Sequence, residues 1–542
     1  GYYSMYAGGL LYAPMLRQYS FLETIRKVFK KEDPEVAYNL ERIVLTLFYF
    51  DVFGFRSIEN FKTVYPEEYG ILIGRINSPG LRTLRRYLHW IRKLKVSEEL
   101  MDEYAKVYLK NGLVKWGVLY IDEHFLPYHG MRVITMGWFT VRDRALKGSY
   151  DFIANDEKYN PLLFLIRPSS EDLLQKIPEI INKAKKLAME VGIDPKDLTV
   201  IFDREGYCAE LFLALSDKEE PSAENGKDAV NFISWAKYSD KWVNDFEESI
   251  FTEEVTINYE VQKSEVIKYF DTTRMMNKYG KIRAIVIMSG KEKRRIAIYT
   301  NDFKSDPCRI IQLMCRRWGQ ENLIKTLKLR HLIDYHPGYI SEELEEQPLR
   351  DNPELLELKK KKANLTSQLH KQELKLAEKI LKEKDTQLKL GDIEKREIDL
   401  LAEIRSLESQ IILLELKETE LPEEVLFEQA HRGMKLSELD YEKKRFLDCI
   451  KVFAYHIDKK MCELLEKHYK VRNVEKEIWP ALAMIVRRGG YLKLERGKLR
   501  VRLKRFQNPV IDYAARHLCE ELNQMAPQTR DKFQFPIQYE VE

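Results

Sequence analysis

The sequence predicts an α/β protein with a mixed sheet in the middle of the chain, a helical segment before it and a long helical hairpin after it. Three patterns predict this fold class. Between residues 115 and 330, short β-rich apolar runs alternate with stretches of helical periodicity. Residues 21–110 show helical spacing of apolar residues, and residues 353–420 combine heptad spacing with dense Lys and Glu and no aromatic side chain.

Composition excludes several classes of protein. Of the 542 residues, 44% are hydrophobic and 32% are charged, which is typical of a folded soluble chain. No apolar run approaches the roughly 20 residues of a membrane span, and the opening residues lack the pattern of a secretory signal. The six cysteines form no C-x-x-C pair, which argues against a disulfide scaffold or zinc ribbon and indicates a reducing compartment. The net charge of +4 says little about partners.

We expect five regions along the chain. They are a helical N-terminal domain that could bind DNA (1–112), a catalytic core in two parts (113–230 and 301–345), a β-rich insertion (231–300), a coiled-coil helical hairpin (346–425) and a C-terminal helical region with a basic β-hairpin (426–542).

A helix is expected to begin at Ser78-Pro79 in the N-terminal region, because Ser caps helices and Pro suits a first turn. Its apolar positions lie on one side, and three arginines lie on the other: Arg82, Arg85 and Arg86. Such a helix could lie against DNA, or it could be an amphipathic helix with a solvated face; the spacing leaves both open.

The middle of the chain supplies the elements of the sheet. We expect strands at 116–121, 131–141, 149–154, 198–202, 232–236, 255–261, 281–288 and 294–300, and helices at 171–191 and 306–329. Strands alternating with helices in this way indicate a mixed sheet covered by helices.

Two heptad seams predict the helical hairpin. They consist of Leu358, Leu365, Leu369 and Leu376, and of Ile393, Leu400, Ile404, Leu407, Ile411 and Leu414. Gly391-Asp392 is expected to end the first helix and cap the second. The hairpin could pack on itself or pair with another subunit.

A basic β-hairpin is expected near the C-terminus, with strands at 491–494 and 499–503, after a helix at 441–468. Between residues 487 and 505 there are nine basic residues and one acid. Alternation places Arg500, Arg502 and Lys504 on one face, either to follow DNA phosphates or to protect an edge strand.

Three acids stand out by their positions. Asp122 and Asp203 are expected to end apolar strands, where an unpaired carboxylate is costly, and Glu321 lies within the predicted helix at 306–329. Two strand-end aspartates and one helical glutamate can converge on two Mg²⁺ ions, which clamp the attacking and leaving oxygens of a phosphoryl displacement. Taken singly, each acid could equally cap a turn or form a salt bridge.

The helix around Glu321 adds cations to this set. Arg317 and Lys328 lie at intervals of four and seven residues from Glu321, and Lys325 shares their face. This arrangement suits a metal site beside a phosphodiester, and it also suits ordinary salt bridges along a helix.

Residues 315–328 resemble the signature Y-x2-R-x3-E-x6-K of bacterial insertion-sequence cut-and-paste DDE transposases, the YREK type. Arg317, Glu321 and Lys328 match at the family spacing, with Trp318 after the Arg, whereas the Tyr position holds Met314. Residues 121–122 and 202–207 resemble the two aspartate motifs of the family.

The resemblance implies a ribonuclease-H-like core with a β-rich insertion before Glu321. It implies that Asp122, Asp203 and Glu321 hold two Mg²⁺ ions, with Mn²⁺ as a substitute, for cleavage at transposon ends and strand transfer into target DNA. Arg317 and Lys328 would contact DNA phosphates. The implied partners are double-stranded DNA, as terminal inverted repeats and target, and a second subunit in a homodimer, in a prokaryotic, nucleoid-associated cytoplasmic setting without a membrane.

Some relatives hold a flipped base on an aromatic side chain, and Trp235, Trp242 and Trp318 are candidates, although burial is expected for each. Alternation predicts that Glu123 and Glu205 point away from the site. Two other functions stay open: a catalytically inactive DNA-binding and oligomerising protein derived from a transposase, and a ribonuclease-H-like nuclease without strand transfer.

Overall fold

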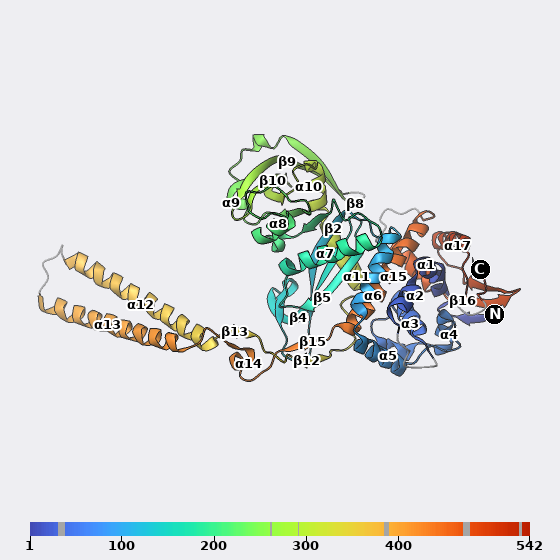
Figure 1. The fold of residues 1–542 in the computed structure, drawn as a ribbon, viewed down its shortest axis with the longest axis horizontal. Coiled ribbons are helices and arrows are strands. Elements are labelled where there is room, and N and C mark those ends of the chain that lie inside the picture. Colours follow the sequence, from blue (N-terminus) through green and yellow to red (C-terminus); the bar gives the residue numbers. More distant parts are fainter. Residues whose placement is uncertain (31–37, 261–262, 291, 384–389, 470–476, 530–533) are drawn as a thin grey trace. The chain divides into compact units, whose positions relative to one another are not determined.

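The computed structural model describes the chain except residues 31–37, 261–262, 291, 384–389, 470–476 and 530–533. The chain divides into two compact bodies (Figure 1). The first body comprises Gly1–Tyr128, Met136–Tyr339 and Asp440–Glu542, and the second comprises His129–Thr135 and Ile340–Leu439. No described helix has the length and apolar content needed to cross a membrane.

A mixed sheet forms the centre of the first body, which confirms the α/β class. Its first five strands run in the order β5-β4-β2-β6-β7, with β6 and β7 parallel to β2, and β4 antiparallel to both β2 and β5. They are β2 (Val118–Pro127), β4 (Arg144–Asn155), β5 (Pro161–Pro168), β6 (Thr199–Phe202) and β7 (Asn231–Trp235).

Helices join the parallel strands and cover both faces of this sheet. The helix α7 (Leu173–Glu190) connects β5 to β6, and α8 (Ala209–Leu215) connects β6 to β7. On β2, Leu119 and Ile121 belong to the hydrophobic cluster shared with α7, while Tyr120 belongs to the cluster shared with α10 (Pro307–Cys315). Because successive side chains of β2 point to opposite faces of the sheet, this strand contributes to two hydrophobic cores.

The predicted β-rich insertion continues the same sheet. Beyond β7, four antiparallel strands follow in the order β11-β10-β9-β8. They are β8 (Glu253–Glu260), β9 (Lys263–Met276), β10 (Gly280–Ser289) and β11 (Arg294–Thr300). The strand β9 was missed because its exposed face places charged residues between apolar ones, and β5 was missed as well.

The predicted N-terminal helices are present but pack within the first body. They are α2 (Phe21–Val28), α3 (Leu40–Val52), α5 (Leu81–Leu94) and α6 (Ser97–Lys110), and they contact α15 (Glu442–Glu466) or one another. The ring of Phe453 in α15 lies 4.6 Å from Phe21 and 4.9 Å from Tyr104. Phe453 thus shares one core with residues 432 and 349 positions earlier in the chain.

The predicted start of α5 is wrong. The helix begins at Leu81 with Gly80 as its N-cap, and Ser78 lies before it. The Ser78 amide donates to the Pro66 carbonyl at 2.9 Å, which fixes this residue in the preceding loop rather than at a cap position. Arg82, Arg85 and Arg86 are exposed on α5, and Arg85 forms an ion pair with Glu59.

The predicted basic β-hairpin is confirmed as β16 (Gly490–Glu495) and β17 (Lys498–Leu503). It lies in a four-stranded sheet of order β1-β16-β17-β18, between β1 (Tyr2–Ser4) and β18 (Ile537–Val541), so both ends of the chain meet there (Figure 1). The edge-strand alternative is wrong, because β17 pairs on both sides. The remaining helices here are α16 (Trp479–Val486) and α17 (Pro509–Gln524).

The second body contains the predicted helical hairpin, α12 (Pro353–Glu383) and α13 (Leu390–Glu420) (Figure 1). The pairs Lys362–Glu418 and Gln372–Glu403 show that the helices run antiparallel. The described seam positions are less exposed than most of their neighbours, so the hairpin packs on itself. Gly391-Asp392 does not separate the helices, because α13 already begins at Leu390; the side chain of Ile393 lies outside the described residues.

Two short strand pairs form the rest of the second body. The strand β12 (Ser341–Glu343) pairs with β15 (Ser437–Leu439), and β13 (Leu349–Asp351) pairs with β14 (Glu424–Leu426). These pairs bring the two ends of the hairpin together.

Candidate active site

Asp122 and Asp203 lie at one edge of the sheet. The parallel pairing of β2 with β6 matches Tyr120 with Ile201, so the two aspartates follow at equivalent positions. Asp203 ends β6 as expected, and its carboxylate accepts the Arg204 amide at 2.7 Å. Asp122 does not end its strand, because β2 continues to Pro127 by pairing with β4. Asp122 lies instead just beyond Tyr120, the last residue of β2 that pairs with the parallel strand β6.

The predicted helix at 306–329 is broken beside the third acid. The helix α10 ends at Cys315, and α11 (Trp318–Arg330) begins three residues later, with Arg317 as its N-cap. Tyr159 explains the break, because its ring packs on Gly319 and its hydroxyl donates to the Arg316 carbonyl at 3.0 Å. Glu321 therefore lies in the first turn of α11, with its side chain facing the sheet edge.

The Arg317 guanidinium joins the three predicted acids. Its Nη1 lies 3.4 Å from Asp122 Oδ2, and its Nη2 lies 3.4 Å from Asp203 Oδ2 and 3.6 Å from Glu321 Oε1. The Arg317 side chain is only 13% exposed. Three carboxylates from β2, the end of β6 and α11, separated by long stretches of sequence, thus surround one cationic group.

Burial makes this a costly place for negative charge. It raises the pKa of Asp122 to about 6, against the opposing effect of the Arg317 guanidinium. Burial and the neighbouring Glu205 carboxylate also raise the pKa of Glu123 well above its usual range. The acids therefore depend on a positive partner to stay ionised together.

An open depression lies beside this cluster. Asp122, Glu123, Glu321, Lys325 and Lys328 line it, together with two apolar residues of α11, Ile324 and Leu329. Glu123 borders the depression, but its side chain lies beside the Glu205 and Asp172 carboxylates, on the face of β2 that packs against α7, as alternation along the strand predicts. The depression thus combines acids with two lysines.

The lysines and a histidine form a second layer of contacts. Lys328 Nζ lies 3.1 Å from Asp334 Oδ2, and the other Asp334 oxygen lies 2.7 Å from His124 Nε2. His124 and Asp334 were missed by sequence reasoning. The available signal was the position of His124, two residues after Asp122 on the same face of a strand.

The three carboxylates have the donor chemistry of a site for hard divalent cations, which prefer oxygen ligands. Their contacts with a shared cation fit that chemistry as well. Within the described residues, however, no three His, Cys, Asp or Glu side chains are spaced closely enough to hold a metal ion. At the three acids, the Arg317 guanidinium lies between the carboxylates. The three carboxylates thus supply the oxygen ligands that Mg²⁺ or Mn²⁺ prefers, whereas the distances between them in this structure suit the Arg317 guanidinium.

The other predicted DNA-binding residues lie on separate surfaces. On β17, Arg502 pairs with Glu540 at 2.8 Å and Arg500 pairs with Glu495 at 3.3 Å. Just after the strand, the Lys504 ammonium lies 4.5 Å from the Tyr3 ring. The alternation is as predicted, because Val501 and Leu503 are buried. Acids of the same sheet thus offset part of this charge.

Of the three tryptophans, Trp318 departs from the prediction of burial. Its side chain is 65% exposed at the start of α11, next to Arg317. Trp235 and Trp242 are partly buried, and the Arg274 guanidinium lies 4.0 Å from the Trp242 ring. Trp318 is therefore the one of these three that is open to a ligand beside the acids.

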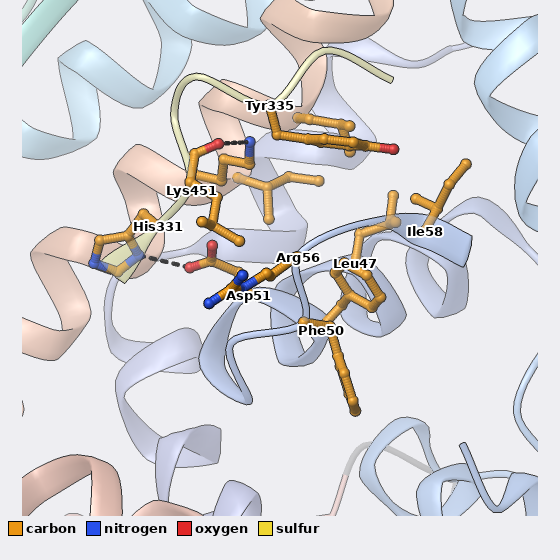
Figure 2. Close-up of a pocket in the computed structure, with 12 residues that line it drawn as sticks. Leu47, Phe50, Asp51, Arg56, Ile58, His331, Tyr335 and Lys451 are labelled. Atoms are coloured by element: carbon orange, nitrogen blue, oxygen red, sulfur yellow. Dashed lines mark hydrogen bonds and ion pairs between the residues drawn. The ribbon is translucent and has the colours of Figure 1, made fainter. Parts of the chain in front are cut away.

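Buried ion pairs hold the far end of α11, around a small cavity (Figure 2). His331 Nδ1 lies 2.6 Å from Asp51 Oδ2 of α3, and Lys451 of α15 donates to the Leu332 carbonyl at 2.7 Å. Arg330 Nε donates to Asp458 of α15 at 2.7 Å. The helix that carries Glu321 is thereby fixed to the helical part of the same body.

Comparisons with known proteins relate the chain to a family and to a solved structure. Residues 6–531 match the model of a family described as "Transposase protein". The chain is also similar to a solved structure titled "Cryo-EM structure of piggyBac transposase synaptic complex with hairpin DNA", at a TM-score of 0.30 and 8% identity, over 61% of this chain and 69% of that chain. No curated protein matches the sequence.

Proposed function

The chain belongs to the family described as "Transposase protein", and from this premise we propose that it cuts DNA at transposon ends and joins those ends to target DNA. In this proposal Asp122, Asp203 and Glu321 are the catalytic carboxylates. The main support for the proposal is that these three side chains surround the Arg317 guanidinium.

The strand order supports a ribonuclease-H-like core for this protein. The five strands β2, β4, β5, β6 and β7 can be numbered 1 to 5 by their order in the chain. Their order across the sheet is then 3-2-1-4-5, and strand 2, which is β4, is antiparallel to the other four. The first acid lies on the first strand, the second follows the fourth strand, and the third lies on a helix after the antiparallel extension. The spacing of Arg317, Glu321 and Lys328 supports the DDE type within this class.

The proposed cofactor is a pair of Mg²⁺ ions held by the three carboxylates, with Mn²⁺ as a substitute. When bound, such ions activate an attacking oxygen and stabilise a leaving one in phosphodiester chemistry. The protein's own residues do the rest. Arg317 offsets the repulsion among the acids, and Lys325 and Lys328, in the depression, bind the phosphates on either side of the scissile bond.

We propose that Lys328 is held in place for this task. Its contact with Asp334, which also contacts His124, fixes the ammonium at the wall of the depression. A fixed cation loses less conformational entropy on binding a phosphate than a free one. The exposed indole of Trp318 offers a surface for a base beside the same site.

The proposed partners are duplex DNA and a second copy of the chain. The basic face of β17 and the exposed arginines of α5 (Arg82, Arg85 and Arg86) are candidate surfaces for DNA outside the active site. A homodimer follows from the proposed reaction, because two transposon ends have to be cut together.

Strand cleavage tests the proposal. The substrate is DNA that carries the element's own ends, with Mg²⁺ or Mn²⁺ supplied, and the Glu321→Gln variant is compared with the parent. A matched control is Glu408→Gln, on the exposed surface of α13. We expect the parent and the control to cut and to join ends, and Glu321→Gln to bind the same DNA without cutting.

Two other results would point elsewhere. Cutting without joined products would favour a nuclease, and end binding without cutting by the parent would favour an inactive DNA-binding protein. Cutting by Glu321→Gln at the rate of the parent would contradict the assignment of the three acids.

A further inference from the structure

A ribbon of strands extends past the sheet edge that holds Asp122 and Asp203. The strand β6 ends at Phe202, but β2 continues to Pro127 and β4 reaches back to Arg144, where it pairs with β3 (Met136–Phe139). Ile153, the partner of Asp122, lies nine residues after Arg144. At about 3.3 Å per residue, the end of the ribbon extends about 30 Å from Asp122.

The end of this ribbon, residues 136–147, is called the wing, and it exposes large apolar side chains. Met136 is 58% exposed, Trp138 is 53% exposed and Val141 is 81% exposed. Across the strands, Trp138 is paired with Ala145. Because alanine is too small to cover an indole, one face of the Trp138 ring stays open.

Positive charge surrounds these apolar side chains. Residues 136–147 contain Arg142, Arg144 and Lys147, and their one acid is Asp143. Asp143 adopts a left-handed conformation, with φ of 48°, at the turn between the two exposed arginines. An apolar wedge flanked by cations is the chemistry of side chains that enter between DNA bases while arginines hold the neighbouring phosphates.

The base of the wing is fixed. The Trp138 amide donates to the Tyr150 hydroxyl at 3.0 Å, and the Phe125 ring lies 5.5 Å from Phe139 and 5.4 Å from Tyr150. A side chain at Gly137 would overlap Phe125 and Tyr150, so glycine allows this close packing. The apolar end is therefore held at a set distance from the acids.

We propose that the wing is a second DNA contact, at which Trp138 and Val141 unstack a base step while Arg142 and Arg144 bind the flanking phosphates. The inference rests on the proposed function, because it takes the DNA to lie across the three acids. At roughly 3.4 Å per base pair, the contact falls about nine base pairs from the scissile phosphate.

Base unstacking can be measured directly with 2-aminopurine, whose fluorescence rises when it leaves the base stack. The probe is placed at successive positions of a duplex that carries the element's own end, and Glu321→Gln is used so that the duplex stays intact. We expect a fluorescence rise centred about nine base pairs from the cleavage site, at the spacing given by the ribbon.

Variants assign that signal to the wing. On the Glu321→Gln background, Trp138→Ala should abolish the rise, and Trp138→Phe should restore most of it, because an aromatic ring still fills the step. Arg142→Gln should instead weaken binding. It should also reduce the slope of log affinity against log salt concentration by about one, as expected for the loss of one phosphate contact. Tyr238→Ala, at an aromatic residue that is 67% exposed elsewhere in the same body, is the matched control.

The outcomes separate this inference from the proposed function. If the parent binds end DNA but Trp138→Ala and Arg142→Gln change neither the signal nor the affinity, the wing is no DNA contact. If Trp138→Ala changes only the mass of the assembly, the wing is a protein interface, which also overturns the inference. Failure of the parent to bind end DNA at all would defeat the proposed function first.

Discussion

The ring of Tyr159 packs directly on Gly319, and its hydroxyl donates to the Arg316 carbonyl at 3.0 Å. Tyr159 belongs to the turn between β4 and β5, where its own carbonyl accepts the Tyr455 hydroxyl at 3.1 Å. Through its main chain and its side chain, Tyr159 thus connects the sheet, α15 and the break between α10 and α11. Since Arg317 and Glu321 flank Gly319, this contact sets the direction in which both side chains reach the aspartates.

Gly319→Ala should disrupt the candidate site more than it disrupts the fold. The added methyl group would overlap the Tyr159 ring, so α11 or the ring has to move. We expect cleavage of end DNA to fall by about tenfold or more, on the scale of a misplaced catalytic group. The milder Tyr159→Phe should cost roughly 1 kcal/mol of stability through the lost hydrogen bond.

Thermal unfolding and single-turnover cleavage measure these two effects. Gly80→Ala is the control, because a methyl group there meets no atom within 4 Å. Full cleavage activity in Gly319→Ala would show that the break in the helix does not position Glu321.

Arg317→Ala should make the acids depend on an added cation. Without the guanidinium, Asp122, Asp203 and Glu321 repel one another, and removing one partner of a buried charge set costs about 3–5 kcal/mol at most. We expect a lower melting temperature in metal-free buffer, and a larger stabilisation by Mn²⁺ in this variant than in the parent. Differential scanning fluorimetry across a Mn²⁺ series tests this without measuring activity.

The control for that series is Arg82→Ala, an exposed arginine of α5. Equal stabilisation of parent and Arg317→Ala by Mn²⁺ would argue that the three acids do not hold the metal.

The buried Asp151 carboxyl group should make the protein less stable as the pH rises. It is fully buried on β4, neither carboxylate oxygen has a hydrogen-bond partner among the described residues, and burial raises its pKa to about 7. Because the folded state holds this proton more tightly than the unfolded state, stability is lost as the pH rises from about 4 to 7. At about 1.4 kcal/mol per pKa unit, the loss is about 4 kcal/mol at most.

Asp151→Asn keeps the shape and removes the titration. Its melting temperature should match that of the parent near pH 4 and exceed it near pH 8, with Asp143→Asn, on the exposed wing, as the control. A parent and variant that differ by the same amount at both pH values would contradict the prediction.

The sequence predicts the acids better than the contacts that arrange them. Asp122, Asp203 and Glu321 could be selected because local patterns place them beside apolar strands and in a helical segment. The break before Trp318 could not be predicted, because it depends on Tyr159, more than 150 residues earlier. The length of β2 was missed for a related reason: residues after Asp122 are held in the strand by β4, a partner that is invisible to a local pattern.

The helical hairpin shows the same limit. Heptad spacing predicted both α12 and α13, and in the structure the two helices pack against each other with their described seam residues less exposed than most neighbours. The spacing could not tell whether the seam would be used within the chain or between chains. In the structure α12 and α13 use it together, so any role in assembly has to come from other side chains.

Those side chains exist on α13, and they make the proposed homodimer testable. Ile412 is 57% exposed, Leu413 is 54% exposed and Leu416 is 60% exposed, on the outside of the helix pair. Burying such side chains against a second copy would contribute about 1.5–3 kcal/mol for each one fully covered. We expect Leu416→Glu to lower the mass of the DNA-free protein in light scattering from that of a dimer toward that of a monomer. Asn364→Glu, on the exposed surface of α12, is the control and should leave the mass unchanged. If the protein stays dimeric both with Leu416→Glu and with residues 353–420 replaced by a short linker, the interface lies elsewhere.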